Sequence, residues 1–137
     1  MSNKETISAI YAAFLRNDIP FILNHLTDDV KWNYSTDNSG QKAGLPWLKL
    51  YSGRDDVLNF FKAVAEMGIY QFDILTMLEN ENQIVSKIDI KCKYFADEIV
   101  HFWTFNNEGK VICYEQVVDT AKQISCYENA TKSAVAG

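Results

Sequence analysis

His101 has the clearest capacity for proton transfer in this sequence. It lies in the run Ile99–Phe105 (IVHFWTF), where strand alternation places His101, Trp103 and Phe105 on one face. An imidazole titrates near neutral pH, so a histidine set in an aromatic wall can serve as a general acid or base. The alternative is a core histidine whose ring nitrogens are satisfied by a backbone or tyrosine partner.

Three further side chains are candidates for moving or holding a proton. Tyr11 lies on the apolar stripe of a predicted N-terminal helix, and its hydroxyl either enters a cavity or packs near water. Tyr34 offers a second phenol, with a place in a cavity wall as the alternative. Asp119 lies at a strand end, opposite in parity to Tyr114, and either turns inward or anchors the chain through turn hydrogen bonds.

Aromatic side chains are abundant, with three Trp, seven Tyr and eight Phe. Core packing explains any one of them, but several rings on one side of a sheet also suit a hydrophobic ligand pocket. The residues expected to line such a pocket are Phe14, Trp32, Trp47, Phe61, Trp103, Tyr114 and Gln116.

Composition indicates one globular domain and argues against nucleic acid, metal, cofactor and membrane partners. The chain has 137 residues, a net charge of −5 and a pI of about 4.9, and its Lys and Arg residues form no cluster, so we expect no nucleic acid partner. Three cysteines without CxxC spacing and two histidines predict no metal site and no cofactor. No apolar run has the length of a signal peptide or a membrane span, so we expect a cytoplasmic protein with reduced thiols and no membrane partner.

Three helices are predicted in the first half of the chain from apolar residues at helical spacing. Ile7–Leu15 carries such a stripe over two turns. Ile19–Leu26 carries a shorter one, with Asp18 as a candidate N-cap. Val57–Val64 carries a third, and Ser52 is the expected N-cap of a capping box there.

Strands are predicted where the apolar period changes to two. Val30–Tyr34 forms the first, and residues 35–51 read as a loop whose apolar residues fold back onto the body. Tyr70–Leu78 and Ile84–Phe95 follow, and then a hairpin closed by the turn Asn106–Lys110.

Helices followed by antiparallel strands are typical of the α+β class. We expect residues 1–121 to form one domain: a cone-shaped, strongly curved mixed or antiparallel sheet with about three helices on its concave face. Residues 122–137 are small and polar and predict a frayed tail. A sheet wrapped around one layer of helices leaves a cavity at its mouth, which is a default ligand site.

Three segments, in this order, resemble the SnoaL-like, ketosteroid isomerase-related proteins of the nuclear transport factor 2-like superfamily, which have a cystatin-like fold. The first segment is Tyr11–Trp32, with YxAF and LxDDVxW. The second is Leu45–Phe61, with YxGRxxVxxFF. The third is His101–Thr120, with HxWTF, GKV and VDT. The resemblance covers residues 6–120 and implies a homodimer through the outer sheet face, for which Val111, Cys113 and Val117 are the expected apolar residues.

The resemblance also assigns roles to individual positions. The isomerases use a helix Tyr, an Asp base and a protonated Asp in the hairpin, and these positions correspond to Tyr11, to Tyr34 or its neighbourhood, and to His101. Because neither acid is kept, a true steroid Δ-isomerase is disfavoured. The cyclases use a hairpin carboxylate, for which Glu115 and Asp119 are available.

The function implied is a cofactor-free acid–base isomerase, cyclase or hydrolase that acts on a small hydrophobic carbonyl or polyketide-like compound. In this scheme His101 transfers the proton, and Tyr11, with Tyr34, polarises the oxygen. The alternatives are a module that binds a small hydrophobic molecule without reacting it and a dimerisation domain of the same fold.

Overall fold

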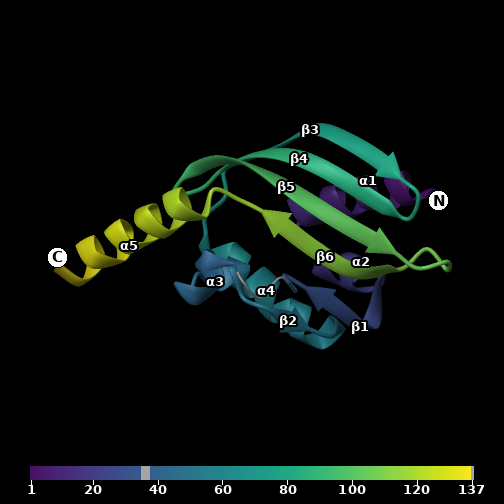
Figure 1. The fold of residues 1–137 in the computed structure, drawn as a ribbon, viewed down its shortest axis with the longest axis horizontal. Helices are drawn as coiled ribbons and strands as arrows, with labels where there is room; N and C mark the ends of the chain where they lie inside the picture. The colour runs from purple at the N-terminus through teal and green to yellow at the C-terminus, as the bar shows by residue number, and fades with distance from the viewer. Residues whose placement is uncertain (35–37, 137) are drawn as a thin grey trace.

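The computed structural model describes residues 1–34 and 38–136, which form the helices and strands drawn in Figure 1. The helices are α1 (Asn3–Leu15), α2 (Ile19–Leu23), α3 (Ser39–Lys42), the 3-10 turn η1 (Pro46–Leu48), α4 (Arg54–Glu66) and α5 (Thr120–Ala136). The strands are β1 (Leu26–Trp32), β2 (Tyr51–Ser52), β3 (Gln71–Asn80), β4 (Gln83–Lys91), β5 (Ala96–Phe105) and β6 (Val111–Val117).

One mixed sheet of six strands, in the order β2-β1-β6-β5-β4-β3, organises the molecule. β1 runs parallel to β6, and all the other neighbouring strands are antiparallel. Figure 1 shows α1, α2 and α4 on one side of this sheet, whereas α5 projects away from the body. The predicted α+β class is confirmed, and the strong curvature of the sheet stays a prediction.

The β5–β6 hairpin forms as its sequence predicts. His101 and Trp103 face the helices and are buried, while the intervening Phe102 is half-buried on the outer face. The turn is closed by the Asn106 backbone N–H, which donates to the Lys110 carbonyl at 2.9 Å. Asn106 Oδ1 also accepts from the backbone N–H of Lys110, and Gly109 takes the positive φ of 78° that this turn requires.

Helix α1 presents one apolar face to the sheet. Ser2 and Glu5 form a capping box at its start. Ile7, Ile10 and Tyr11 are buried as the stripe predicts, and this places the Tyr11 ring under the inner face of the sheet. Leu15, expected at the end of the same stripe, is instead 62% exposed because the helix ends there.

Two local expectations for the first half of the chain are wrong. Helix α2 is capped by Asp18, as expected, but ends at Leu23, and β1 then begins at Leu26, ahead of the expected start at Val30. The N-cap of α4 is Gly53 at a φ of 90°, and the expected capping residue, Ser52, belongs to β2. A side chain at Gly53 would be strained at this φ, which explains why glycine precedes the helix.

Residues 38–50 fold back onto the body, as their apolar side chains predict, and residues 35–37 of the predicted loop lie outside the described residues. Leu45, Trp47 and Leu48 are at most 4% exposed. Leu50 does not follow this rule and is 41% exposed. The segment therefore contributes Trp47 to the core from outside the sheet.

The C-terminal segment corrects another expectation. The polar, frayed tail predicted for residues 122–137 is instead helix α5 through Ala136. Asp119 caps this helix, because its Oδ1 accepts from the Lys122 backbone N–H at 3.1 Å. Gln123 is 1% exposed, so the first turns of α5 belong to the folded body.

The outer face of the sheet is a partly apolar surface. Val100 and Phe102 of β5 lie opposite Val117 and Glu115 of β6. Val117 is 58% exposed. Val111, which we expected on this face, is fully buried because it pairs with the inward-facing end of β5.

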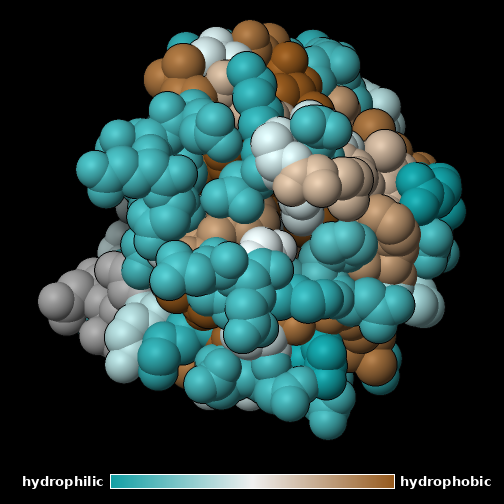
Figure 2. Space-filling view, turned by 90° about the vertical axis from the view of Figure 1, so that its right-hand side faces the viewer, coloured by the Kyte–Doolittle hydropathy of each residue, from teal (hydrophilic) through white to brown (hydrophobic). Residues whose placement is uncertain are grey.

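Strand β3 is the exposed edge of the sheet. Ile74, Leu75 and Leu78 are 42%, 48% and 61% exposed, and the register shifts between Ile74 and Thr76. Figure 2 shows apolar side chains along its upper edge, the side on which β3 lies in Figure 1, with polar side chains over much of the rest of this view. The irregularity interrupts the pairing pattern that an edge strand would offer to another chain.

In residues 1–34 and 38–136, no helix is both long and apolar enough to cross a membrane.

Candidate functional site

A cavity lies between the inner face of the sheet and helices α1 and α4. Its empty space measures about 610 Å³, a volume that includes open solvent. None of its lining residues, within the described part of the chain, is Asp, Glu, Lys or Arg. Nine of the eleven predicted site residues line it: Tyr11, Phe14, Trp32, Trp47, Phe61, His101, Trp103, Tyr114 and Gln116.

Tyr34 and Asp119 lie outside this cavity. Asn33 takes a φ of 56°, which breaks the strand alternation and turns Tyr34 outward. Tyr34 is 48% exposed, with the Lys31 ammonium 4.6 Å from its ring centre. Asp119 is exposed at the start of α5, where it caps the helix. The structure therefore brings neither of these two residues to His101.

A chain of hydrogen bonds joins Trp103, Tyr11 and His101. Trp103 Nε1 donates to the Tyr11 hydroxyl oxygen at 3.0 Å, and this oxygen lies 2.9 Å from His101 Nδ1. An indole N–H is a donor only, so the Tyr11 oxygen accepts from Trp103 and the Tyr11 hydroxyl proton can be donated to Nδ1. We assign the neutral tautomer of His101 that accepts this bond at Nδ1 and carries its proton on Nε2.

Burial keeps both members of the Tyr11–His101 pair uncharged at neutral pH. It lowers the pKa of His101 from 6.5 to about 3, because a buried imidazolium loses its hydration. It raises the pKa of Tyr11 from 10.0 to about 12, and the nearby Ser86 hydroxyl and Trp103 indole offset part of this rise. His101 thus presents a neutral imidazole, held in position by a neutral phenol.

Ser86 belongs to the same polar cluster and is absent from our expected site residues. It is fully buried on β4 directly opposite His101, and its Oγ has no hydrogen-bond partner among the described residues. Ser86 alternates in step with Ile88 and Ile90, which face inward. The strand alternation could therefore have indicated Ser86 as a site residue.

The Gln116 amide is fixed in one orientation beside His101. Its Nε2 donates to the Trp47 carbonyl at 2.8 Å and to Asn33 Oδ1 at 3.1 Å. Asn33 Nδ2 in turn donates to the Trp47 and Lys49 carbonyls, both at 3.0 Å. A flipped Gln116 amide would place its oxygen against two acceptors. Gln116 and His101 are direct cross-strand partners.

Gln123 joins α5 to the cavity wall. Its Oε1 accepts from Trp47 Nε1 at 2.8 Å, and its Nε2 donates to Asp97 Oδ2 at 2.9 Å. Asp97 Oδ2 also accepts from the backbone N–H of Asp119 at 3.2 Å. Asp119, a capping residue type before α5, is the sequence signal that could have indicated this helix.

A group of aromatic rings forms the wall next to His101. Trp32 stacks on Tyr114 with ring centres 4.1 Å apart and an interplanar angle of 26°. Trp103 lies 4.6 Å from Tyr114, and His101 lies 5.2 Å from the same ring. The Nε1 of Trp32 is buried without a partner among the described residues. These flat apolar surfaces suit a hydrophobic ligand.

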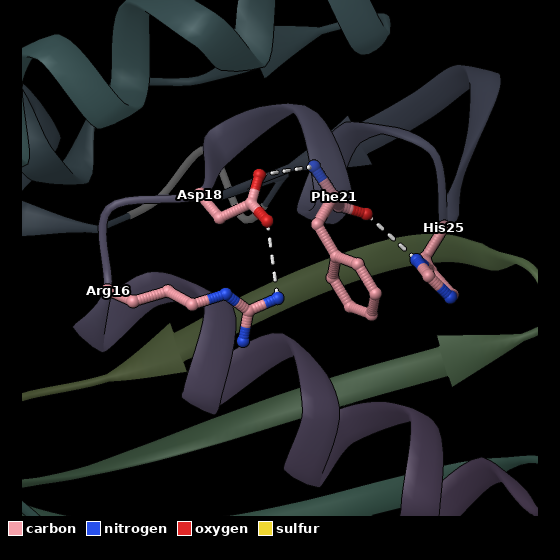
Figure 3. A network of polar contacts seen from close by, with 4 residues as sticks. All are labelled: Arg16, Asp18, Phe21 and His25. Carbon is pink, nitrogen blue, oxygen red and sulfur yellow. Dashed lines mark hydrogen bonds and ion pairs between the residues drawn. The ribbon is translucent and has the colours of Figure 1, made fainter.

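His25, the second histidine, follows α2 (Figure 3) and is not among the residues that line the cavity. Its Nδ1 donates to the Phe21 carbonyl at 2.8 Å, and the two rings are 4.6 Å apart. Asp18 accepts from the Phe21 backbone N–H at 3.3 Å and pairs with Arg16 at 3.2 Å. This network holds α2 in place and gives His25 a structural explanation.

Metal binding and thiol chemistry have little support at this site. Within residues 1–34 and 38–136, no group of three or more His, Cys, Asp or Glu residues is placed to hold a metal ion. Cys92, Cys113 and Cys126 are free thiols. Burial raises the pKa of the Cys113 thiol, which lowers its fraction of nucleophilic thiolate.

Comparison with solved structures places the chain among nuclear transport factor 2-like and cystatin-like folds. An NTF2-like protein from Cytophaga hutchinsonii has a TM-score of 0.68 at 12% identity and covers 88% of this chain and 93% of its own. A steroid delta-isomerase from Pseudomonas aeruginosa has a TM-score of 0.67 at 13% identity and covers 100% and 97%. IdmH of Streptomyces antibioticus, a proposed polyketide cyclase, has a TM-score of 0.70 at 10% identity and covers 93% and 99%.

The chain belongs to the SnoaL-like domain family, whose model matches residues 7–114. A comparison with curated proteins found no match. At these low identities, the likeness to solved structures establishes the fold alone, and the function has to be argued from the site.

Proposed function

We propose that the cavity binds a small, uncharged hydrophobic carbonyl compound and that His101 Nε2–H donates to its oxygen. His101 would be the acid group of a cofactor-free isomerase, cyclase or hydrolase. The observation that carries this proposal is the Tyr11–His101 hydrogen bond of 2.9 Å in the wall of an apolar cavity.

A neutral imidazole in this setting is suited to polarise a carbonyl oxygen. Negative charge that develops on that oxygen is stabilised most strongly by a fixed donor in a site that excludes water. The hydrogen bond from Tyr11 holds His101 in the tautomer that directs its other N–H to the ligand. We expected Tyr11 to polarise the oxygen itself, but its hydroxyl is committed to His101, so Tyr11 is a positioning residue in this proposal.

The charge of the ligand follows from the composition of the cavity. A charged ligand would lose its hydration without a compensating ion, because the lining residues of the described chain include no Asp, Glu, Lys or Arg. An uncharged compound with a polar oxygen avoids this cost. The fold neighbours named as a steroid delta-isomerase and a proposed polyketide cyclase support an enzyme of this kind.

A second candidate function is ligand binding without reaction. Enolisation or cyclisation needs a base as well as an acid, and the lining residues of the described chain contain no carboxylate. A protein that carries or senses a hydrophobic carbonyl compound would need the donor at His101 and no base.

We also propose a homodimer through the outer sheet face, in the cytoplasm, where the thiols stay reduced. Val100, Phe102 and Val117 form the apolar part of this face. An interface of this kind would leave the cavity, on the opposite face of the sheet, open to ligand.

Coumarin and naphthalene test the proposed function, because both are flat bicyclic probes and coumarin alone has a carbonyl. Calorimetric titration should show coumarin binding about tenfold more tightly than naphthalene, the typical effect of one buried hydrogen bond. His101→Phe should abolish the difference, and His25→Phe, which changes the other histidine, should preserve it. Equal affinities for the two probes in the natural protein would refute the proposal.

Catalysis is tested separately by chromatography of carbonyl compounds recovered after incubation with the protein. A converted compound whose turnover falls in His101→Phe supports the enzyme. Compounds that stabilise the fold and are recovered unchanged support the binding function.

A further inference from the structure

Gln116 places a fixed hydrogen-bond acceptor beside the proposed donor. Both protons of its Nε2 are directed to Asn33 Oδ1 and to the Trp47 carbonyl, at 3.1 Å and 2.8 Å. Its Oε1 receives no hydrogen bond from any described residue. Gln116 lines the cavity, and because its amide oxygen cannot exchange places with its nitrogen, this oxygen is a defined acceptor.

The second amide of the cavity does not offer the same group. Gln123 uses its Oε1 for Trp47 Nε1 and its Nε2 for Asp97, so both of its ends are engaged. The two amides that line the cavity therefore differ in kind: Gln123 binds the protein itself, whereas Gln116 keeps an oxygen for a ligand.

The acceptor and the donor lie next to each other. Gln116 and His101 are directly opposed on β6 and β5, and side chains opposed in this way have Cβ atoms about 5 Å apart. Both residues line the cavity from the same face of the sheet. When a ligand carbonyl accepts from His101 Nε2–H, the ligand atom next to that carbonyl therefore lies near Gln116 Oε1.

The geometry points to a ligand that carries an N–H or O–H donor within one or two bonds of its carbonyl oxygen, as in a cyclic secondary amide. The carbonyl accepts a hydrogen bond from His101, and the adjacent N–H or O–H donates a hydrogen bond to Gln116 Oε1. This inference rests on the proposed function and names the specificity-determining residue of the same site. A carbonyl compound without the donor would cover Gln116 Oε1 and leave it unpaired in the complex, which is the usual basis for strong discrimination.

A third flat probe separates this inference from the proposed function. The lactam 2-quinolinone has the shape of coumarin, with an N–H in place of the ring oxygen. Calorimetric titration of the natural protein should show 2-quinolinone binding at least tenfold more tightly than coumarin, with naphthalene weakest. Equal binding of 2-quinolinone and coumarin, both tighter than naphthalene, would overturn the inference and leave the proposed function standing. Equal binding of all three would overturn both.

Gln116→Met tests whether Gln116 is the acceptor. The methionine keeps the length of the side chain and removes the amide, so the preference for 2-quinolinone over coumarin should disappear. Gln71→Met, the same change in a residue outside the cavity, should keep the preference. A preference that survives in Gln116→Met assigns the acceptor to another group, such as the Tyr114 hydroxyl, and overturns the inference. If Gln116→Met fails to fold, the comparison of probes in the natural protein still decides.

Discussion

His101 and Tyr11 form a neutral hydrogen-bonded pair in which each residue depends on the other. The Trp103 indole N–H donates to the Tyr11 oxygen, and in the assigned tautomer the Tyr11 hydroxyl donates to His101 Nδ1. His101 in the apolar cavity wall is therefore the neutral tautomer with its proton on Nε2. Such a group acts as a hydrogen-bond donor at neutral pH, where an exposed histidine would be partly protonated.

Burial of His101 makes the stability of the fold depend on pH. The pKa is about 3 in the folded protein and about 6.5 in an unfolded chain, so the unfolded chain binds the extra proton first as the pH falls. The contribution of neutral His101 is complete above pH 6.5 and is lost as the pH falls towards 3. Urea unfolding should show the natural protein losing about 3 kcal/mol more than His101→Phe between pH 7 and pH 4. Equal losses in the two proteins would contradict the assigned burial.

Tyr11→Phe should destabilise the protein through unpaired groups and not through lost packing. The ring remains, but Trp103 Nε1 and His101 Nδ1 both lose their partner. We expect the free energy of unfolding to fall by about 1–3 kcal/mol, measured by urea denaturation. Tyr34→Phe, at an exposed tyrosine, should change it by less than about 0.5 kcal/mol. A Tyr11→Phe variant as stable as the natural protein would show that the chain of hydrogen bonds contributes nothing.

At the scale of elements, the sequence predicted the features that depend on interactions between residues close together in the chain. Alternation identified the face of β5 that carries His101 and Trp103, and helical spacing identified the face of α1 that carries Tyr11. The hairpin turn was predictable because Gly109 adopts the required positive φ and Asn106 Oδ1 accepts from backbone N–H groups of the turn. These elements supply the centre of the candidate site.

The failures have equally specific causes. A single residue, Asn33, with its positive φ, reverses the side-chain direction expected for Tyr34. Helix α5 has few large apolar residues. Besides the packing of Tyr127 on Trp47, its first turns are held by the polar contacts of Gln123 with Trp47 and Asp97, which are far away in the sequence. Hydrophobic periodicity cannot detect contacts of this kind.

Gln123→Leu should release α5 from the body. The substitution keeps the size of the side chain but leaves Trp47 Nε1 without its acceptor and Asp97 without one of its donors. Amide hydrogen exchange in the first turns of α5 should become about tenfold faster, as expected for a loss near 1.4 kcal/mol. Lys122→Ala, at the exposed neighbouring position, is the control. Unchanged protection in Gln123→Leu would mean that other contacts hold the helix.

At the scale of the molecule, the two faces of the sheet have separate tasks in this account. The inner face carries the cavity, and the outer face carries the proposed dimer contact. The chain shares this scaffold with its neighbouring folds at low sequence identity, so its function is argued from a few side chains of the cavity. Here those side chains are uncharged, which separates this cavity from one built around carboxylates.

Phe102→Glu should convert the proposed dimer into a monomer, because it places a charge within the apolar centre of the outer face. Light scattering of the natural protein should give twice the mass of the chain, and that of the variant should give the mass of one chain. Leu15→Glu, at an apolar residue that is exposed on α1, should leave the dimer intact. A natural protein that is monomeric at all concentrations would rule out the dimer and leave the cavity proposal unaffected.

The central claim is that His101 donates a hydrogen bond to a ligand carbonyl inside the cavity. The infrared stretch of the coumarin carbonyl, isotopically labelled so that it separates from the protein amide band, reports this contact directly. The account predicts a lower frequency for bound coumarin than for coumarin in an apolar solvent, and a return to the apolar value in His101→Phe. A bound carbonyl that has the apolar frequency in the natural protein would contradict the account.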